Sequence, residues 1–238
     1  MSERFLRAQM LLGEEAMEKL RQSHVAVFGL GGVGSWCAEA LARSGVGTLT
    51  IIDQDKVGES NTNRQLCALS STIGRSKAQV MAERIKDINP KINVIPLEAR
   101  YEASTREHFF TAHFDYIVDC IDLVACKLDL IETALSHDIP IISSLGTGNK
   151  QDAEKLCVTD IANTLGCPFA RVMRKELHRR GIDHLPVVFS SEEAMTPAQL
   201  EAPPPGRRSV PGSLVWVPAS AGLLLCSHVV KSLLSKDE

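Results

Sequence analysis

HVAVFGLGGVG, residues 24–34, is the stretch of sequence that decides the fold. A short apolar run leads into a glycine-rich turn, and residues 35–44, rich in Ala and Leu, follow. This order predicts a strand, a tight turn and a helix, which open a βαβ unit. In such a unit the glycines let a phosphate approach the backbone, and the N–H groups at the helix start attract its charge. The glycines that we expect at a phosphate site are Gly29, Gly31, Gly32 and Gly34. A turn that only packs strand on helix is the alternative.

Strand-like and helix-like segments alternate along the rest of the chain. Further strands are predicted at residues 49–52, 92–97, 116–121, 139–143, 156–159 and 187–190. Further helices are predicted at residues 77–87, 126–137, 171–180 and 219–234, with one opening at 104–107 on a capping-box pattern. This alternation predicts an α/β fold with a Rossmann-like nucleotide-binding sheet, mostly parallel in the N-terminal part, mixed toward the C-terminus, and with helices on both faces.

We expect a single domain over residues 1–238. Residues 1–22 have the apolar spacing of an amphipathic helical lead-in. Residues 23–145 are the expected nucleotide-binding half, and residues 146–238 the half that serves substrate and dimer contacts. Prolines and glycines crowd residues 192–212, which predicts a mobile loop there.

The composition is that of a folded protein of a reducing compartment. Hydrophobic residues make up 44% and charged residues 23% of the chain, which is ordinary for a globular domain. The net charge of −3 argues against an evenly basic nucleic-acid binder but allows a local basic patch. Without a signal pattern or an apolar run of membrane-spanning length, we expect a cytoplasmic protein with no membrane partner. The seven cysteines form no Cys-x-x-Cys pair, so we expect reduced thiols and no zinc site.

Asp53 ends the second predicted strand, about 20 residues beyond the glycine turn, where dinucleotide-binding folds place a carboxylate for a ribose hydroxyl. It suits NAD and ATP equally, and a solvated turn Asp beside Asp55 is the alternative.

Residues 60–65 separate these two cofactors, because they bring Asn61, Arg64 and Gln65 just after the second strand. Lys77, which opens the next helix, adds a second cation. An enzyme that cleaves the α–β bond of ATP needs fixed cations, since negative charge builds on the bridging and leaving phosphates. A dehydrogenase has no evident need of them. ATP is therefore the expected nucleotide, although a solvated helix Lys is the alternative for Lys77.

Asp119 and Asp122 end the fourth apolar run, where carboxylates at strand ends face the ligand crevice of an open sheet. Magnesium commonly takes one or two protein carboxylates together with phosphates and waters. We therefore predict that Asp122 holds Mg²⁺ and that Asp119 is structural, with a helix cap as the alternative for Asp122.

Together these residues resemble the superfamily of ubiquitin-activating and sulfur-carrier-adenylating enzymes. The resemblance covers residues 4–144 and rests on Arg4, Arg7, Gly29-x-Gly31-Gly32-x-Gly34-Ser35, Asp53-x-Asp55, Asn61-x-Asn63-Arg64-Gln65, Lys77 and Asp119-Cys-x-Asp122. The family's ATP and magnesium positions match Gly32, Asp53, Arg64, Lys77 and Asp122. Arg7 matches an arginine that reaches the nucleotide across a homodimer.

Within that superfamily the sequence is most similar to the bacterial tRNA threonylcarbamoyladenosine dehydratases. The matching segments are GVGSW (32–36), NTNRQ (61–65), MAERI (81–85), INP (88–90), VTD (158–160) and VFSSE (188–192). The resemblance implies that ATP activates the carboxylate of threonylcarbamoyladenosine in tRNA by adenylation, and that an internal nucleophile then closes a ring. It also implies tRNA and a sulfur-transfer accessory protein as partners. Some relatives carry a Cys shortly before the final helix, where this sequence has WVPAS (216–220), so we expect no catalytic cysteine.

The expected tRNA footprint is the basic helix near residue 175, with Arg207 and Arg208 as a second contact. Its members are Arg171, Arg174, Lys175, His178, Arg179 and Arg180. Phosphate neutralisation would supply most of the affinity. A solvated helix face is the alternative.

Three other functions stay open at this point. An adenylyltransferase for a ubiquitin-like sulfur carrier is the first, although such enzymes usually carry two Cys-x-x-Cys zinc pairs. A nicotinamide oxidoreductase and a non-catalytic member of the superfamily are the others.

Overall fold

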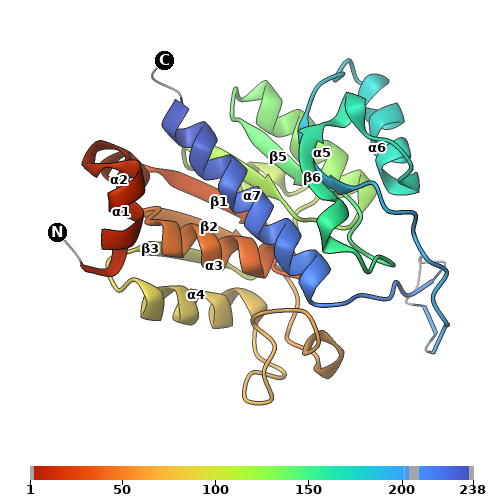
Figure 1. Ribbon diagram of the computed structural model, residues 1–238, viewed down its shortest axis with the longest axis horizontal. Helices are drawn as coiled ribbons and strands as arrows, with labels where there is room; N and C mark the ends of the chain where they lie inside the picture. The colour runs from red at the N-terminus through yellow and green to blue at the C-terminus, as the bar shows by residue number, and fades with distance from the viewer. Residues whose placement is uncertain (1–2, 201, 204–208, 236–238) are drawn as a thin grey trace.

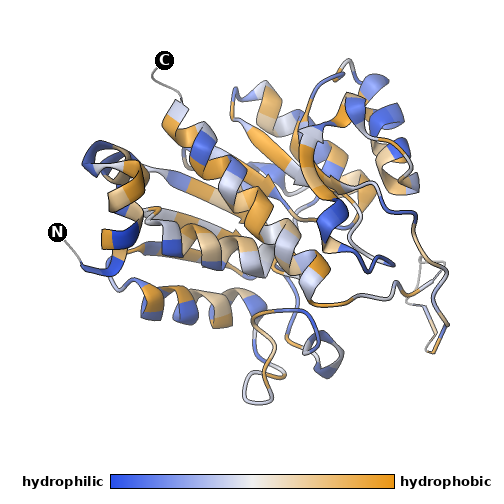
Figure 2. Ribbon diagram, viewed as in Figure 1, coloured by the Kyte–Doolittle hydropathy of each residue, from blue (hydrophilic) through white to orange (hydrophobic). Residues whose placement is uncertain are grey.

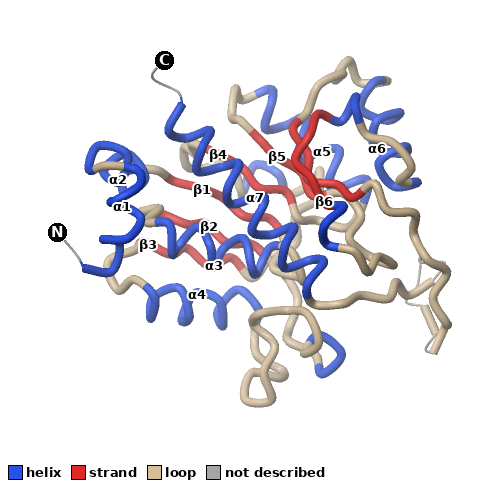
Figure 3. Tube along the Cα trace, viewed as in Figure 1, coloured by secondary structure: helices blue, strands red, loops and turns tan. Residues whose placement is uncertain are grey.

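The computed structural model describes residues 3–200, 202–203 and 209–235. Within these ranges, seven strands form one sheet in the order β3-β2-β1-β4-β5-β7-β6 (Figure 1, Figure 3). The strands are β1 His24–Phe28, β2 Thr48–Ile52, β3 Asn93–Leu97, β4 Tyr116–Asp119, β5 Ile141–Ser144, β6 Leu156–Asp160 and β7 Pro186–Ser190. All pairs are parallel except β6 with β7, where Val158 faces Val188. The predicted sheet, parallel at first and mixed toward the C-terminus, is confirmed.

Helices precede, connect and follow these strands. They are α1 Leu6–Leu12, α2 Glu14–Gln22, α3 Gly34–Ser44, α4 Lys77–Ile88, α5 Val124–Ser136, α6 Pro168–His178 and α7 Trp216–Leu234. Short 3-10 turns lie at η1 Glu3–Phe5, η2 Glu59–Asn61, η3 Arg106–His108, η4 Ala153–Lys155 and η5 Ile161–Asn163. The described residues of 192–212 form no helix or strand, in agreement with the predicted loop, while Arg207 and Arg208 lie outside the described residues.

Two predicted helices differ from the structure. The lead-in is two helices, because Gly13 has a φ of 85° and separates α1 from α2. The helix expected to open at residues 104–107 is only the turn η3. There the Thr105 hydroxyl bonds with the backbone of Glu102 and Arg100, so it closes a local turn instead of capping a helix.

Helices cover both faces of the sheet, because alternate residues of each strand point to opposite sides. Val25 and Val27 of β1 lie in a core shared with α3, α4 and α7. Ala26 and Phe28 lie in a second core with α5 and α6. Figure 2 shows hydrophobic residues along the central strands and along α7.

Helix α7 is long and apolar enough to cross a membrane by length and composition, so the expectation that no segment reaches this length is wrong on that measure. It lies along α3 on the face of the sheet (Figure 1). A Cβ on Gly222 would lie 2.5 Å from the backbone oxygen of Val33, so the two helices are in backbone contact. Helix α7 begins at Trp216, three residues before the predicted start at residue 219.

The strand order reverses direction between β1 and β4, since β2 and β3 lie on one side of β1 and β4 and β5 on the other. In open α/β sheets, ligands bind outside the carboxyl ends of the strands at such a switch point. This end of the sheet is therefore where a site is expected.

Candidate functional site

A cleft of about 640 Å³ lies at this switch point, bounded by the carboxyl ends of β1, β2, β4 and β5. Most of the residues predicted from the sequence line it. They are Gly29, Gly31, Gly32, Asp53, Asp55, Asn61, Arg64, Gln65, Lys77 and Asp122. Gly34 and Arg7 are not among the lining residues.

Two glycines of the turn are required by the fold itself. Gly29 has a φ of 90°, and a Cβ on it would lie 2.8 Å from the backbone oxygen of Cys120. A Cβ on Gly34 would lie 1.8 Å from the backbone oxygen of Gly29. These contacts hold β1, the turn and the loop after β4 together, so Gly34 acts in packing and not in the cleft.

At Gly31, in contrast, no packing contact with the described residues requires a glycine. The nearest atom to a Cβ built on it is Gln65 Nε2 at 3.9 Å, an ordinary contact. The turn continues into α3, which begins at Gly34 without a side-chain cap. Helix starts leave N–H groups without intrahelical partners, although the Ser35 N–H already donates to the Gly31 carbonyl at 3.2 Å. An open glycine beside an uncapped helix start, at the edge of a cleft, suits close approach of a phosphate.

Asp53 fixes the geometry between the turn and β2. Its Oδ2 accepts from the Leu30 N–H at 2.7 Å, and its Oδ1 accepts from the Asp55 N–H at 2.8 Å. Burial raises the pKa of this carboxyl, and the nearby Lys77 ammonium opposes the rise. Each oxygen keeps a second lone pair, so Asp53 can still accept from a ribose hydroxyl.

Lys77 is buried at the start of α4, with only 5% of its surface exposed. Its Nζ donates to Asp55 Oδ2 at 2.9 Å, and its backbone N–H donates to the Asp55 carbonyl. The solvated-lysine alternative is therefore wrong. A buried ammonium held at a cleft edge by one carboxylate keeps two donors for an anion.

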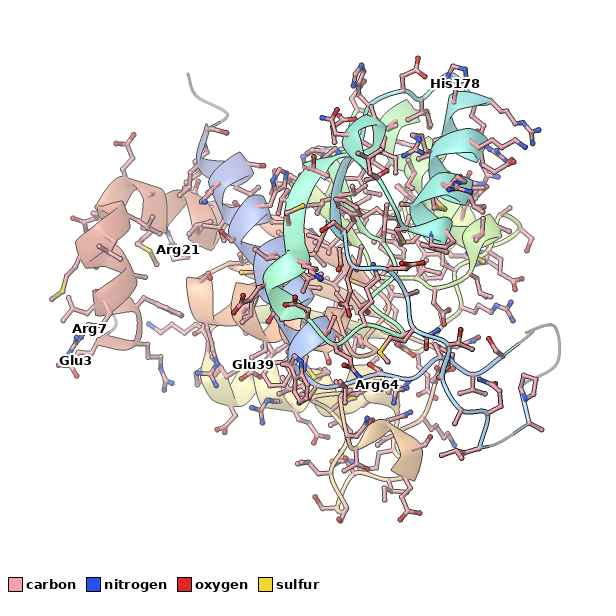
Figure 4. All side chains as sticks on the ribbon, turned by 45° about the vertical axis from the view of Figure 1, so that its right-hand side comes forward. Glu3, Arg7, Arg21, Glu39, Arg64 and His178 are labelled. Atoms are coloured by element: carbon pink, nitrogen blue, oxygen red, sulfur yellow. The ribbon has the colours of Figure 1, made fainter. Side chains whose placement is uncertain are left out.

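Arg64 packs its side-chain stem across the glycine turn, since its Cγ is 3.5 Å from a Cβ built on Gly32. Its guanidinium donates to Ser60 O and Asn63 Oδ1, both at 2.9 Å, and Trp36 Nε1 holds the Arg64 carbonyl at 3.2 Å. The guanidinium is thus oriented by its own loop at the cleft edge (Figure 4).

Asn61 and Gln65 shape the loop that carries Arg64. Asn61 Oδ1 accepts from the Gly58 N–H at 3.0 Å, and the Asn61 carbonyl accepts from the Gln65 N–H at 2.9 Å. The Gln65 side chain is buried beneath Gly31.

The loop after β4 rests on a buried ion pair that the sequence did not reveal. Lys127 Nζ lies 2.7 Å from Asp119 Oδ2 and 2.9 Å from Ser143 Oγ, and all three residues are fully buried. Asp119 Oδ1 accepts from the Ile121 N–H at 3.1 Å. Burial raises the pKa of Asp119, and Lys127 opposes that rise. The only signal was the single lysine of the predicted helix 126–137, a segment that also carries Asp129 and Glu132.

Asp122 stands at the exposed tip of this loop and lines the cleft. The N-cap residue of α5 is Leu123, so Asp122 lies one residue before the position that the capping alternative gave it. In the described part of the chain, no group of three or more His, Cys, Asp or Glu residues could hold a metal ion. A single carboxylate nevertheless suits Mg²⁺ when nucleotide phosphates supply further ligands.

Arg7 lies on α1 at the left edge of the molecule in Figure 4, well separated from Arg64. Its neighbours in α1 include three exposed apolar side chains, Leu6, Met10 and Leu11. Arg7 therefore contributes nothing to the cleft of its own chain.

The far wall of the cleft comes from the C-terminal half, where the sequence analysis predicted tRNA contacts but no residue of the nucleotide site. It consists of Gly146, Thr147, Gly148, Phe169, Val210, Pro211 and Ser213. Asn149 joins the predicted loop, residues 192–212, to this wall. It makes two hydrogen bonds with the backbone of Gly212 and accepts one from the Met195 N–H. Lys150 is buried beside it and donates to the Ser190 carbonyl at 2.7 Å.

Two cysteines line the cleft, and both are poor nucleophiles. Burial raises the pKa of the Cys120 thiol to about 12 and also raises that of Cys126. Cys226 lies in α7 beside Ser44, and burial raises its pKa to about 11. In WVPAS (216–220), Pro218 lines the cleft where a catalytic cysteine was considered. The absence of a catalytic cysteine stays a prediction.

A parallel sheet with a glycine turn, a carboxylate at the second strand and a cleft at the switch point defines a Rossmann-like nucleotide-binding protein. The chain belongs to the ThiF family, whose model matches residues 5–238. It is 41% identical to the tRNA threonylcarbamoyladenosine dehydratase of Bacillus subtilis (strain 168) over 247 residues, covering 100% of this chain and 97% of that protein.

A crystal structure is similar over the same length. It is that of the E. coli tRNA N6-threonylcarbamoyladenosine dehydratase in complex with ATP, with a TM-score of 0.89, 35% identity, and coverage of 99% of this chain and 95% of that one. The E. coli sulfur carrier protein ThiS adenylyltransferase is 34% identical over 143 residues, which cover 59% of this chain and 57% of that protein.

Proposed function

We propose that this protein is an ATP-dependent dehydratase that activates the carboxylate of threonylcarbamoyladenosine in tRNA and releases AMP and pyrophosphate. The observation that carries the proposal is the likeness to a dehydratase along the whole chain, including the C-terminal wall of the cleft. The carrier-protein adenylyltransferase is similar over 59% of the chain only. ATP is favoured over NAD by the ATP-bound relative and by the cations at the cleft.

The chemistry has two steps. A carboxylate oxygen of the nucleoside attacks the α-phosphorus of ATP, the bond to the bridging oxygen breaks, and pyrophosphate leaves. A nucleophilic atom of the same nucleoside then attacks the activated carbonyl carbon, loses its proton, and expels AMP with the former carboxylate oxygen. One water is lost overall. Because both groups belong to one nucleoside, the second step is intramolecular and requires no protein nucleophile.

The cleft residues supply binding and charge. Asp53 holds the ribose, the turn at Gly31 and Gly32 receives phosphate, and Arg64 and Lys77 neutralise charge on the bridging and leaving oxygens. Asp122 would hold Mg²⁺, which supplies further charge stabilisation when bound. The residues present suit that ion because Asp122 faces the cleft with an exposed carboxylate.

Homodimerisation is part of the proposal. Arg7 lies far from the cleft of its own chain, beside exposed apolar side chains of α1, so it acts on the nucleotide of a second copy. We also propose a cytoplasmic protein of one domain, with no membrane partner, and with tRNA and a sulfur-transfer accessory protein as partners.

The test is to incubate the protein with ATP, magnesium and tRNA that carries the uncyclised nucleoside, and then to weigh the nucleoside and measure AMP. Loss of one water with matching AMP release is the expected result. AMP release or pyrophosphate exchange only when a sulfur-carrier protein is added would favour the adenylyltransferase. Absence of ATP binding would indicate a non-catalytic member.

A further inference from the structure

The strand order defines the two ends of the cleft. Asp53 follows β2, the glycine turn follows β1, Asp122 follows β4, and Gly146 follows β5. Neighbouring strands are about 4.8 Å apart, so the β2 and β5 ends are separated by about 14 Å. A ribose on Asp53 and phosphates at the turn occupy the β2 and β1 side. The β5 side is then left for the group that attacks the α-phosphate.

Phe169 is the aromatic residue of this β5 side. It lies in the first turn of α6, lines the cleft, and approaches Gly146, where a Cβ would lie 3.6 Å from Phe169 Cβ. Its ring is only partly buried. Unpaired bases of RNA stack on aromatic side chains.

Helix α6 leads from this ring to the surface. His178 at its end lies far from Arg64 in Figure 4. A groove of about 470 Å³ runs beside the helix. It is lined by Ala162, Arg171, Arg174, Lys175, His178, Ile182, Asp183 and His184. From Phe169 to Lys175 the helix rises by about 9 Å.

The cations of α6 differ in how they are used. Arg179 pairs with Glu176 at 2.7 Å, and Arg180 pairs with Glu132 at 3.1 Å. Arg174 instead donates to the Thr164 hydroxyl. Arg171 and Lys175 are exposed and make no ion pair with any described residue. These two line the groove, whereas Arg179 and Arg180 do not.

We infer that α6 guides the RNA into the site: Arg171 and Lys175 bind backbone phosphates in the groove, and Phe169 stacks the modified adenosine at the β5 end of the cleft. This inference rests on the proposed function. It narrows the tRNA footprint expected on this helix from six basic residues to two. A guanidinium that is already paired with a glutamate contributes less binding free energy when it contacts a phosphate.

The first test compares two double variants of the full-length protein, Arg171→Ala/Lys175→Ala and Arg179→Ala/Arg180→Ala. Both remove two positive charges from the same helix, so a difference between them reports position. The first should weaken tRNA binding about tenfold or more and lower the steepness of its salt dependence by about 1.5, the value for two phosphate contacts. The second should change tRNA binding less than twofold, and neither should change ATP affinity. Equal losses in both variants, or none in the first, would overturn the inference.

The second test concerns the ring. Phe169→Ala should lower kcat/KM for tRNA by about 10- to 100-fold, as expected for loss of one stacked base, with ATP affinity unchanged. Phe169→Tyr keeps the ring and should restore activity to near the original value, which excludes a folding defect at this position. A parallel loss of ATP affinity in Phe169→Ala would assign the ring to ATP and overturn the inference. Failure of the unaltered protein to turn over tRNA would instead refute the proposed function, and the path along α6 with it.

Discussion

Lys77 Nζ lies 2.9 Å from Asp55 Oδ2, and the two side chains differ sharply in exposure, 6% for the lysine and 56% for the aspartate. The carboxylate thus stands at the solvent edge of the cleft, with the ammonium beneath it. An exposed partner is screened by water and contributes little to the energy of the pair. The ammonium, in contrast, is fixed in a water-poor place where it acts strongly on a nearby anion.

Lys77→Met should therefore lower kcat by about 100- to 1000-fold, the cost of removing one fixed group that stabilises transition-state charge. Methionine matches the length of the buried stem, so the fold should be kept. Asp55→Asn, the matched control, should lower kcat less than tenfold, because the Asp55 carbonyl still accepts from the Lys77 N–H. Steady-state kinetics with ATP as the varied substrate measure both. Normal turnover by Lys77→Met would remove Lys77 from the phosphate site.

Gly31→Ala and Gly34→Ala should separate binding from folding. At Gly31 a methyl group meets open cleft, so the protein should fold with nearly unchanged stability and bind ATP at least tenfold more weakly. At Gly34 it would lie 1.8 Å from the Gly29 oxygen, so the turn must shift and the free energy of unfolding should fall by several kcal/mol, on the order of 3. Thermal unfolding with and without ATP reports both. Unaltered ATP affinity in Gly31→Ala would mean that no phosphate approaches this backbone.

The strands and the glycine turn could be predicted because both are local. Apolar runs of strand length and the turn itself require no knowledge of distant residues, and the carboxyl ends of parallel strands meet at one edge of the sheet. This is why Asp53, Arg64, Lys77 and Asp122 could be brought to one cleft from the sequence. Their roles in catalysis remain predictions, which the experiments on these residues test.

Residues that depend on distant partners could not be predicted. Lys127 binds Asp119 and Ser143, which lie on the neighbouring strands β4 and β5. The spacing of residues along the chain does not reveal that these two strands are neighbours in the sheet. Phe169 reaches the cleft only because α6 packs against α5, a helix that is distant from it along the chain. The capping-box pattern at 104–107 predicted a helix that does not form, and here the cause is local. The Thr105 hydroxyl donates to the Arg100 and Glu102 carbonyls and closes a turn instead.

Asp53 should make both ATP affinity and protein stability depend on pH, with opposite signs: ATP affinity falls as pH falls, whereas the contribution of Asp53 to stability falls as pH rises. Burial raises its pKa above the ordinary value of about 3.9, so the carboxyl protonates earlier than in the unfolded chain as pH falls. ATP affinity should then decrease as pH falls through this raised pKa, because the charged acceptor is lost. The native state binds the proton more tightly, so the contribution of Asp53 to stability is present at low pH and is lost as pH rises through the folded pKa.

Asp53→Asn should remove this pH dependence and weaken ATP binding about 10- to 100-fold at neutral pH, the range for a hydrogen bond to a charged group. Calorimetric ATP titrations from neutral pH to the acid limit of folding measure the effect. If Asp53→Asn keeps the same pH profile as the unaltered protein, another group is responsible.

The buried set Asp119, Lys127 and Ser143 should separate stability from activity. Lys127→Met leaves the Asp119 carboxylate buried without its cation, which should cost about 3 to 5 kcal/mol. In a chain of this length that corresponds to a fall in Tm of roughly 10 °C. Replacing all three, by Asp119→Val, Lys127→Met and Ser143→Ala, removes every polar group of the set and should recover most of the lost stability.

In this triple variant, turnover should not recover together with stability. Asp119 Oδ1 accepts from the Ile121 N–H and so fixes the loop that presents Asp122 to the cleft. Without that bond the loop loses its orientation, and misplacement of a catalytic group by about 1 Å costs roughly 100-fold in rate. The triple variant should therefore unfold near the original Tm and still turn over slowly, whereas Lys127→Met should be impaired in both. A triple variant with full kcat would show that the buried charges serve stability alone and that the position of Asp122 is set elsewhere.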